Sequence, residues 1–200
     1  AIRPCQYPHC SRELGIRYTA SHTHPLIGFA DSDWAGCVDT RQSTSGRVFM
    51  LQGGAIMWSA SRQRSIALSS AHAEIVALSE AACDAVYLRR LHASIGMPIL
   101  HPTPVLEDSS SALSWATGHA KWSASRHIPI RDMKVQELRR DGTILPRKVS
   151  TQSQLADAMT KALPHATYVN LRARVLGMQD TKIYDLDISH NARRPPAAAA

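Results

Sequence analysis

Residues 26–59 read L-I-G-F-A-D-S-D-W-A-G-C-V-D-T-R-Q-S-T-S-G-R-V-F-M-L-Q-G-G-A-I-M-W-S, and this stretch decides the fold. Three short apolar runs predict strands, at 26–31, 46–51 and 55–59. A turn-rich segment separates the first two runs, and Gly53-Gly54 marks a turn before the third. A further short strand is expected at 65–68. Successive strands with short connections predict an antiparallel meander.

Downstream of the meander, the pattern changes to that of helices. No Pro or Gly interrupts the alanine- and leucine-rich segment from Ser70 to about Ile95, which predicts a long helix that Gly96 and Pro98 end. Strands are expected at 103–106 and 143–149, and helices at 109–115, 130–140, 152–163 and 168–176. A meander followed by this alternation predicts an α/β fold, in which helices cover a mixed sheet.

Length and composition limit the classes of protein to consider. The 200 residues suit one domain with appendages, and 44% hydrophobic with 20% charged residues is globular composition. We expect a lead-in at 1–24, a domain at 25–178 and a disordered tail at 179–200. No apolar run is long enough to span a membrane, so no membrane partner is expected. The absence of an initiator Met and of a secretion signal predicts a piece of a longer protein.

Charge and cysteine content indicate the partner and the compartment. The net charge of +7 favours an anionic partner, nucleic acid first. Cys5 and Cys10 flank His9, but the second Cys/His pair that a zinc site requires is missing. Reduced intracellular thiols are the simpler interpretation, and they do not distinguish a cytoplasmic particle from the nucleus.

Two acids fall where local structure does not require them. Strand alternation places Asp31 on the face of Ile27 and Phe29, which should be buried, although Asp31 is also a plausible strand-ending polar residue. Glu74 lies on the apolar stripe of the long helix. An ionised carboxylate there is costly unless it meets a cation or a metal, yet an acid near a helix amino terminus is also favourable by itself.

Two further acids carry a weaker signal from local pattern alone. Asp108 follows a strand and precedes three serines, a position typical of a helix cap. Asp157 lies off the apolar stripe of its expected helix, so periodicity predicts a solvated surface acid.

Together these segments resemble the ribonuclease H domain of copia-type retrotransposon Pol polyproteins. The resemblance covers roughly residues 12–178. The motifs that carry it are G-F-A-D-S-D-W-A-G at 28–36, R-Q-S-T-S-G-R-V-F-M-L at 41–51, G-A-I-M-W-S-A-S at 54–61, A-L-S-S-A-H-A-E-I-V-A-L-S-E-A at 67–81, L-E-D-S-S-S-A-L at 106–113 and Q-L-A-D-A-M-T-K-A-L-P at 154–164. It implies a ribonuclease H-like mixed five-stranded sheet, an antiparallel meander followed by parallel strands, flanked by helices. It also implies that the lead-in continues from an upstream polyprotein connection.

The resemblance implies a site and a reaction. The family's four catalytic acids carry over to Asp31, Glu74, Asp108 and Asp157, while the first of the two glutamates in the helix motif is His72 here. In the family, such carboxylates hold two Mg²⁺ ions, with Mn²⁺ as an alternative. Four clustered carboxylates would repel one another strongly without metal. The implied activity is endonucleolytic hydrolysis of the RNA strand of RNA–DNA hybrids, with the 2′-hydroxyl as the discriminator.

Basic residues fit a phosphate-binding role. Residues 121–148 hold eight Lys or Arg against three Asp or Glu. Five basic side chains are candidates for contacts to the nucleic-acid backbone that do not depend on base sequence: Arg62, Arg64, Lys121, Arg126 and Arg131. An ordinary solvated surface would also explain each of them. The segment R-H-I-P-I-R-D-M-K at 126–134 departs from the family, because Pro129 replaces an Asp and Asp132 an aromatic residue. That departure puts the local helix start and a substrate contact in doubt.

Three functional hypotheses follow. The first is a metal-dependent RNA–DNA hybrid ribonuclease. The second is a degenerate or recruited copy that binds nucleic acid without cleaving it. The third is a structural part of a polyprotein that is inactive without the neighbouring reverse transcriptase domain, which the resemblance implies as a partner. Intact acids at all four positions favour the ribonuclease.

Overall fold

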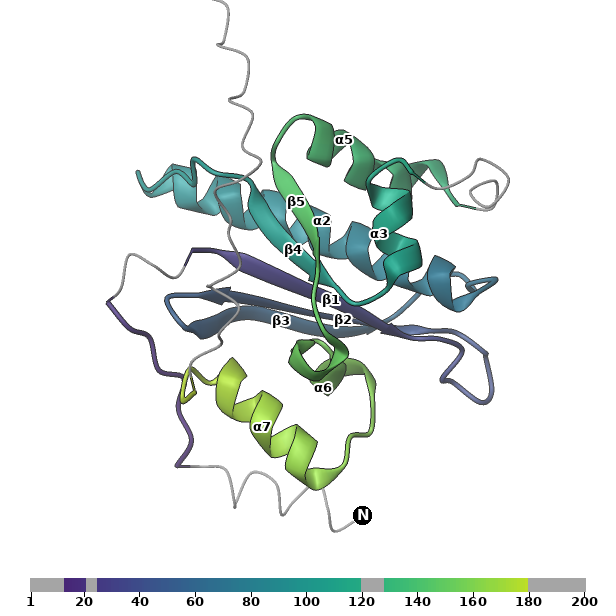
Figure 1. The fold of residues 1–200 in the computed structure, drawn as a ribbon, viewed down its shortest axis with the longest axis horizontal. Helices are drawn as coiled ribbons and strands as arrows, with labels where there is room; N and C mark the ends of the chain where they lie inside the picture. The colour runs from purple at the N-terminus through teal and green to yellow at the C-terminus, as the bar shows by residue number, and fades with distance from the viewer. Residues whose placement is uncertain (1–12, 21–24, 120–127, 180–200) are drawn as a thin grey trace, which may run out of the picture.

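A five-stranded mixed sheet forms the centre of the protein (Figure 1). The computed structural model describes residues 13–20, 25–119 and 128–179. The strand order is β3-β2-β1-β4-β5, with bounds β1 (Ile27–Asp33), β2 (Thr44–Leu51), β3 (Gly54–Arg62), β4 (Thr103–Glu107) and β5 (Ile144–Lys148). The first three strands pair antiparallel, and β4 pairs parallel with both β1 and β5. The predicted α/β fold, a meander followed by parallel strands, is confirmed.

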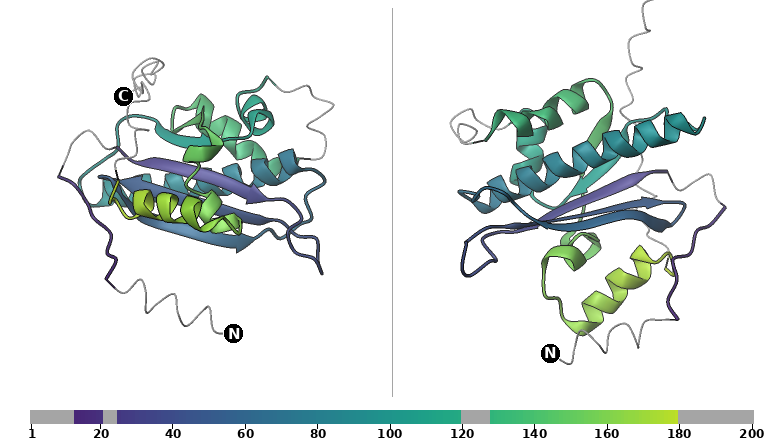
Figure 2. Two further views of the ribbon diagram at one scale, coloured as in Figure 1. Left: turned by 60° about the horizontal axis from the view of Figure 1, so that its bottom comes forward. Right: turned by 180° about the vertical axis from the view of Figure 1, so that it is seen from behind.

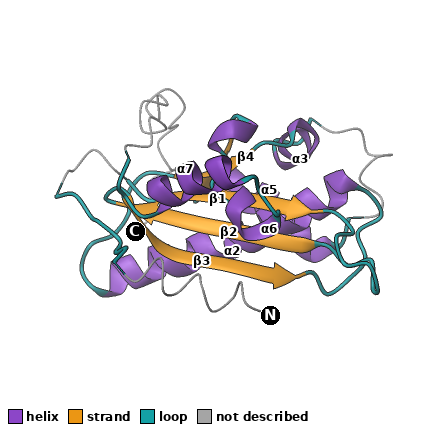
Figure 3. Cartoon of the chain, turned by 90° about the horizontal axis from the view of Figure 1, so that it is seen from below, coloured by secondary structure: helices purple, strands orange, loops and turns teal. Residues whose placement is uncertain are grey.

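Helices cover both faces of this sheet (Figure 2). One face carries α2 (Ser70–Ser94), α3 (Ser110–Ala116) and α5 (Lys134–Arg140), which a 3₁₀ turn at Ile130–Met133 precedes. The opposite face carries α6 (Asp157–Thr160) and α7 (His165–Val175), which lie across the first three strands in Figure 3. Among the described residues, no helix combines the length and the apolarity that crossing a membrane requires.

Side-chain alternation along β1 supplies both hydrophobic cores. Leu26 and Ala30 belong to the core beneath α2, whereas Ile27 and Phe29 belong to the core beneath α6 and α7. The predicted division of this strand into two faces is therefore confirmed. Asp31 is the next residue on the face of Ile27 and Phe29, so its side chain leaves the sheet toward α6.

Two of the expected elements differ in the structure. The short strand expected at 65–68 is absent, because β3 continues to Arg62 and the chain then turns toward α2. Gln63 fixes that turn, since its buried amide nitrogen donates to Ser45 Oγ at 3.0 Å and to the Ala73 carbonyl at 2.9 Å. The single helix expected at 152–163 is instead a 3₁₀ turn at Thr151–Ser153 followed by the short α6.

Residues 13–20 of the expected lead-in run alongside the domain. The Arg17 amide donates to the Leu176 carbonyl at 2.8 Å, and the Thr19 amide donates to the Gln52 carbonyl at 2.8 Å. Gly177 adopts a φ of +69° directly against the Arg17 carbonyl, where a side chain would collide. This segment therefore ties the end of α7 to the β2–β3 turn.

Candidate active site

Asp31 is a fully buried acid near the end of β1. Both of its carboxylate oxygens accept hydrogen bonds from the region of α6. Thr160 Oγ1 donates to Oδ2, and Lys161 Nζ lies 2.9 Å from Oδ1. Asp31 is therefore a structured part of the site, and not a polar residue that merely ends a strand.

Gly46 of β2 pairs with Asp31 across the sheet and lets α6 approach this closely. A Cβ atom at Gly46 would lie 2.6 Å from Thr160 Cγ2 and 2.8 Å from the Ala156 carbonyl oxygen. Any larger residue would push α6 away from the sheet. The glycine thus places the Thr160 and Lys161 donors on Asp31.

Glu74 lies in the second turn of α2 and faces the sheet. Ser69 caps the helix, because its hydroxyl accepts a hydrogen bond from the His72 amide at 3.1 Å. The predicted apolar stripe is confirmed, since Leu78 and Ala81 are fully buried one and two turns beyond Glu74. Among the described residues, buried Glu74 Oε2 has no hydrogen-bond partner. Such an orphaned carboxylate oxygen suits a metal ligand better than a charge that only favours the helix start.

Asp108 follows β4 directly, and the chain on both sides holds it in place. Ser109, rather than Asp108, caps α3, since Ser109 Oγ accepts from the Ala112 amide at 3.2 Å. Thr151 Oγ1 donates to Asp108 Oδ2 at 2.8 Å, and Lys148 Nζ donates to the Asp108 carbonyl. The carboxylate is thus free of the capping role and is oriented by the segment after β5.

Three of the four predicted acids come together. Ligand oxygens of Asp31, Glu74 and Asp108 all lie within 4.8 Å of one another. The strand register brings two of these acids together. Phe29 pairs with Leu106 in parallel strands, and Asp31 and Asp108 each lie two residues further along. Glu74, the third acid, comes from the N-terminal part of α2. Carboxylate oxygens are the ligands that Mg²⁺ and similar hard cations prefer, so these residues fit a divalent ion.

Asp157, the fourth predicted acid, lies beside this group and not within it. It is the first residue of α6, only 6% of it is exposed, and its Oδ1 lies 2.6 Å from Lys161 Nζ. Lys161 thereby bridges Asp157 to Asp31. The solvated surface acid that helical periodicity predicted is wrong, because α6 spans only four residues and rests its first residue against the sheet.

Burial dominates the electrostatics of these acids. It raises the pKa of Asp31 from 3.8 to about 6, although the Thr160 hydrogen bond and the charge of Lys161 oppose it. Burial, followed by the charge of Asp31, raises the pKa of Glu74 from 4.5 to about 8. Burial lowers the pKa of Lys161, but the hydrogen bond to Asp157 and the charge of Asp31 outweigh it, so the pKa lies above its usual value. The crowded carboxylates therefore favour proton uptake, and a divalent cation would compete with those protons.

Glu107 is a fifth carboxyl group that sequence reasoning missed. It ends β4, is fully buried, and accepts a hydrogen bond at Oε1 from the Ser109 amide at 3.0 Å. Burial, and then the charge of Glu74, raises its pKa well above the usual range. The available signal was its place beside Asp108 in a strand whose five residues are all buried. Its hydrogen bond fixes the backbone on both sides of Asp108.

The basic residues expected to bind phosphate are only partly described. Arg62, the last residue of β3, and Arg64, on the chain between β3 and α2, are both exposed. Lys121 and Arg126 lie outside the described residues, as does the side chain of Arg131. The expectation that these five residues bind phosphate stays a prediction.

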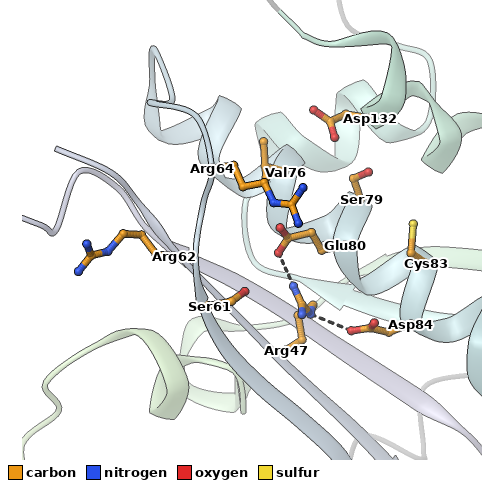
Figure 4. A pocket seen from close by; sticks show the side chains of 10 residues that line it. All are labelled: Arg47, Ser61, Arg62, Arg64, Val76, Ser79, Glu80, Cys83, Asp84 and Asp132. Atoms are coloured by element: carbon orange, nitrogen blue, oxygen red, sulfur yellow. Dashed lines mark hydrogen bonds and ion pairs between the residues drawn. The ribbon is translucent and has the colours of Figure 1, made fainter. Parts of the chain in front are cut away.

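A separate hollow of about 430 Å³ lies between α2 and the second and third strands (Figure 4). Arg47 spans it, with Nε 2.7 Å from Asp84 Oδ2 and a second ion pair to Glu80. In the figure, Arg62 extends away from the other labelled side chains. Ten residues line the hollow: Arg47, Ser61, Arg62, Arg64, Val76, Ser79, Glu80, Cys83, Asp84 and Asp132. The four predicted acids are not among them, so the hollow is distinct from the acid cluster.

Comparison with known proteins agrees with this geometry. No protein-family model matches the chain. Over 155 residues, 76% of the chain, it is 32% identical to the retrovirus-related Pol polyprotein from transposon TNT 1-94 of Nicotiana tabacum. It is also 27% identical to each of the retrovirus-related Pol polyproteins from transposons RE1 and RE2 of Arabidopsis thaliana. The chain spans 11% of the length of the tobacco Pol polyprotein.

Two other comparisons concern a shorter relative and a solved structure. Over 86 residues, 43% of the chain and 61% of the relative, it is 44% identical to secreted RxLR effector protein 161 of Plasmopara viticola. The solved structure of LC11-RNase H1, isolated from compost, superposes with a TM-score of 0.50 at 15% identity. That superposition covers 68% of this chain and 93% of the other. The fold of this Pol homologue is therefore that of ribonuclease H.

Proposed function

We propose that this chain hydrolyses the RNA strand of RNA–DNA hybrids, using divalent cations held by Asp31, Glu74, Asp108 and Asp157. One observation carries the proposal. Three carboxylates from β1, α2 and the end of β4 present oxygens within 4.8 Å of one another, although they are far apart in sequence. The ribonuclease H fold and the Pol homologues support the same function.

The residues of the chain prepare this site for cations. Asp31, Glu74 and Asp108 offer one set of oxygen ligands, and Asp157 lies next to Asp31 to extend it. Mg²⁺ is the expected ion, with Mn²⁺ as the alternative, because both accept carboxylate oxygens. When bound, a pair of divalent cations supplies charge stabilisation for the attacking water and for the departing 3′-oxygen. Thr151 keeps the Asp108 carboxylate oriented through a 2.8 Å hydrogen bond.

The substrate class follows from charge and from homology. A net charge of +7 favours a polyanion, and exposed Arg62 and Arg64 provide two cations on the chain that leads into the helix of Glu74. Phosphate contacts of this kind bind nucleic acid without reading its sequence. Pol homologues and an RNase H fold point to a hybrid as that polyanion, with the ribose 2′-hydroxyl distinguishing the strand to be cut.

The chain is proposed to act as one domain of a larger polyprotein. We assign the catalytic domain to 25–178, with the lead-in before it and a tail from 179 onward. The Pol homologues are far longer than this chain, which spans 11–12% of them. The reverse transcriptase domain of the same polyprotein is therefore the proposed protein partner.

A hybrid-cleavage assay with Mg²⁺ tests the proposal, comparing the wild type with Asp31→Asn. Loss of cleavage in the variant, with hybrid binding retained in fluorescence anisotropy, is the expected result. Equal cleavage would remove Asp31 from the mechanism. Salt-dependent binding by the wild type without cleavage at any Mg²⁺ or Mn²⁺ concentration would favour a copy that only binds. Cleavage that appears only after the polymerase region is added would favour a domain that depends on its partner.

A further inference from the structure

Lys161 occupies the space between the first and the fourth acids. Its Nζ lies 2.9 Å from Asp31 Oδ1 and 2.6 Å from Asp157 Oδ1. The Asp31 side chain is fully buried, and 8% of the Asp157 side chain is exposed. The ammonium group is therefore the counter-ion of two carboxylates that have little access to water.

Local backbone structure holds Lys161 in this position. It is the residue at which α6 ends, with an extended backbone at φ −120° and ψ 145°. Its amide still donates to the Asp157 carbonyl at 3.0 Å, so main chain and side chain both return to Asp157. Gly46 lets the preceding helical turn rest against β2. The fold therefore builds the backbone position of Lys161, and the two ion pairs direct its side chain, 36% of which is exposed, toward the acids.

This position accounts for the division of the four acids into three and one. Asp31, Glu74 and Asp108 share a region that one cation could occupy, whereas Asp157 is outside this group and is joined to Asp31 by the ammonium group of Lys161. A divalent cation that used both Asp157 and Asp31 would lie next to the ammonium group. Two like charges at that separation repel each other, and the two buried carboxylates between them leave little room for screening water, although the Lys161 side chain is 36% exposed.

We propose that Lys161 is an internal counter-ion that holds Asp157 against Asp31 until metal binds, and that it must move aside before a cation can use Asp157. Cation binding is then ordered. The group of Asp31, Glu74 and Asp108 fills first, and the position at Asp157 fills second and more weakly. The inference rests on the proposed function only in taking these acids as metal ligands.

Calorimetric titration with Mn²⁺ alone tests this order. Lys161→Gln removes the charge but keeps a hydrogen-bond donor, whereas Lys161→Arg keeps the charge. We expect the wild type and Lys161→Arg to show one tighter and one weaker site. In Lys161→Gln, the weaker site should bind at least tenfold more tightly, and the tighter site should change much less.

Lys148→Gln is the matched control. Lys148 also lies beside the acids, but its ammonium group donates to the Asp108 carbonyl and to Ser110 Oγ at 3.0 Å, and not to two carboxylates. Removing this charge shifts both sites alike if only the general electrostatic field matters. A selective gain at the weaker site in Lys161→Gln, absent from Lys148→Gln, supports the inference.

A second measurement separates displacement from a loss of folding. With a chelator present, Lys161→Gln should unfold at a lower temperature than Lys161→Arg, and saturating Mn²⁺ should remove most of that difference. Equal Mn²⁺ affinities in the two variants, or a difference in melting temperature that Mn²⁺ leaves unchanged, would overturn the inference. A protein that shows ordered Mn²⁺ binding but cleaves no hybrid would refute the proposed function and leave this inference standing. Hybrid cleavage by the wild type, together with unaltered Mn²⁺ binding in Lys161→Gln, would refute this inference and leave the proposed function standing.

Discussion

Replacing Glu74 with Gln should stabilise the protein at alkaline pH when a chelator removes divalent cations. Gln keeps the size and polarity of the side chain and mimics the protonated acid. In the folded protein, burial and the charge of Asp31 raise the pKa of Glu74 from 4.5 to about 8. The folded state therefore retains a proton that the unfolded chain has lost, and the free energy of unfolding falls as pH rises through this interval.

The size of the effect follows from the same shift. Each tenfold change in proton affinity is worth about 1.4 kcal/mol, so ionising Glu74 in the folded protein costs at most roughly 5 kcal/mol. Glu74 is only partly buried and shares the repulsion with Asp31, so we expect about half of that, on the order of 2–3 kcal/mol. For a chain of this length, this corresponds to a melting temperature roughly 5–10 °C higher than that of the wild type.

Thermal unfolding followed by circular dichroism from pH 5 to pH 8.5, with chelator, measures the difference. The two proteins should melt at similar temperatures near pH 5 and diverge toward pH 8.5. Added Mg²⁺ should stabilise the wild type more than Glu74→Gln, because binding to the folded state adds to stability. Glu137→Gln is the control, since Glu137 forms an exposed ion pair with Lys134 on α5. Parallel pH curves for wild type and Glu74→Gln would refute the assignment of Glu74 to a crowded cation site.

Three further outcomes are expected. Gly46→Ala should lower stability by about 1–3 kcal/mol in chemical denaturation, and should slow hybrid cleavage, because the added methyl group pushes α6 outward. Replacing Arg62 and Arg64 together with Ala should weaken hybrid binding in anisotropy titrations and reduce the salt dependence by about two counterions; an unchanged slope would exclude them from the interface. Thr151→Val should weaken Mn²⁺ binding by roughly threefold to tenfold in calorimetry, since Asp108 loses its orienting hydrogen bond.

The strands and helices that were predicted correctly are those whose structure is decided by residues within the segment itself, and not by contacts with distant segments. Alternation along β1 assigned Ile27, Phe29 and Asp31 to one face, because successive side chains of any strand point to opposite faces of the sheet. The long uninterrupted segment gave α2 nearly to the residue, and its apolar stripe placed Glu74 toward the sheet. Local pattern therefore placed Asp31 and Glu74 toward buried faces, but it left open whether each was a site residue or an ordinary strand-ending or helix-start acid.

Other features of the site depend on residues distant in sequence, and local pattern could not supply them. Asp108 looked like a helix cap until the structure showed Ser109 in that role and Thr151 on its carboxylate. For Glu107 the sequence offered its place beside Asp108, but not its burial, which comes from the strands on either side of β4. The resemblance to a family found Asp108 and Asp157 where periodicity did not, because motif order carries long-range information that a helical period lacks.

Asp157 shows most clearly why a local period fails here. Helical periodicity over the helix expected at 152–163 placed this acid toward solvent, but the chain is α-helical there for only four residues. Two tertiary contacts override the helical propensity: the buried Gln154 amide donates to the Ala30 carbonyl at 2.8 Å, and Gly46 leaves room for the turn to rest on β2. Once anchored at these points, the short helix has one orientation available, and its first carboxylate and its terminal lysine both reach Asp31. The fourth acid and its counter-ion therefore depend on a glycine about 110 residues earlier in the chain, and any change that lifts α6 from β2 should remove both from the site together.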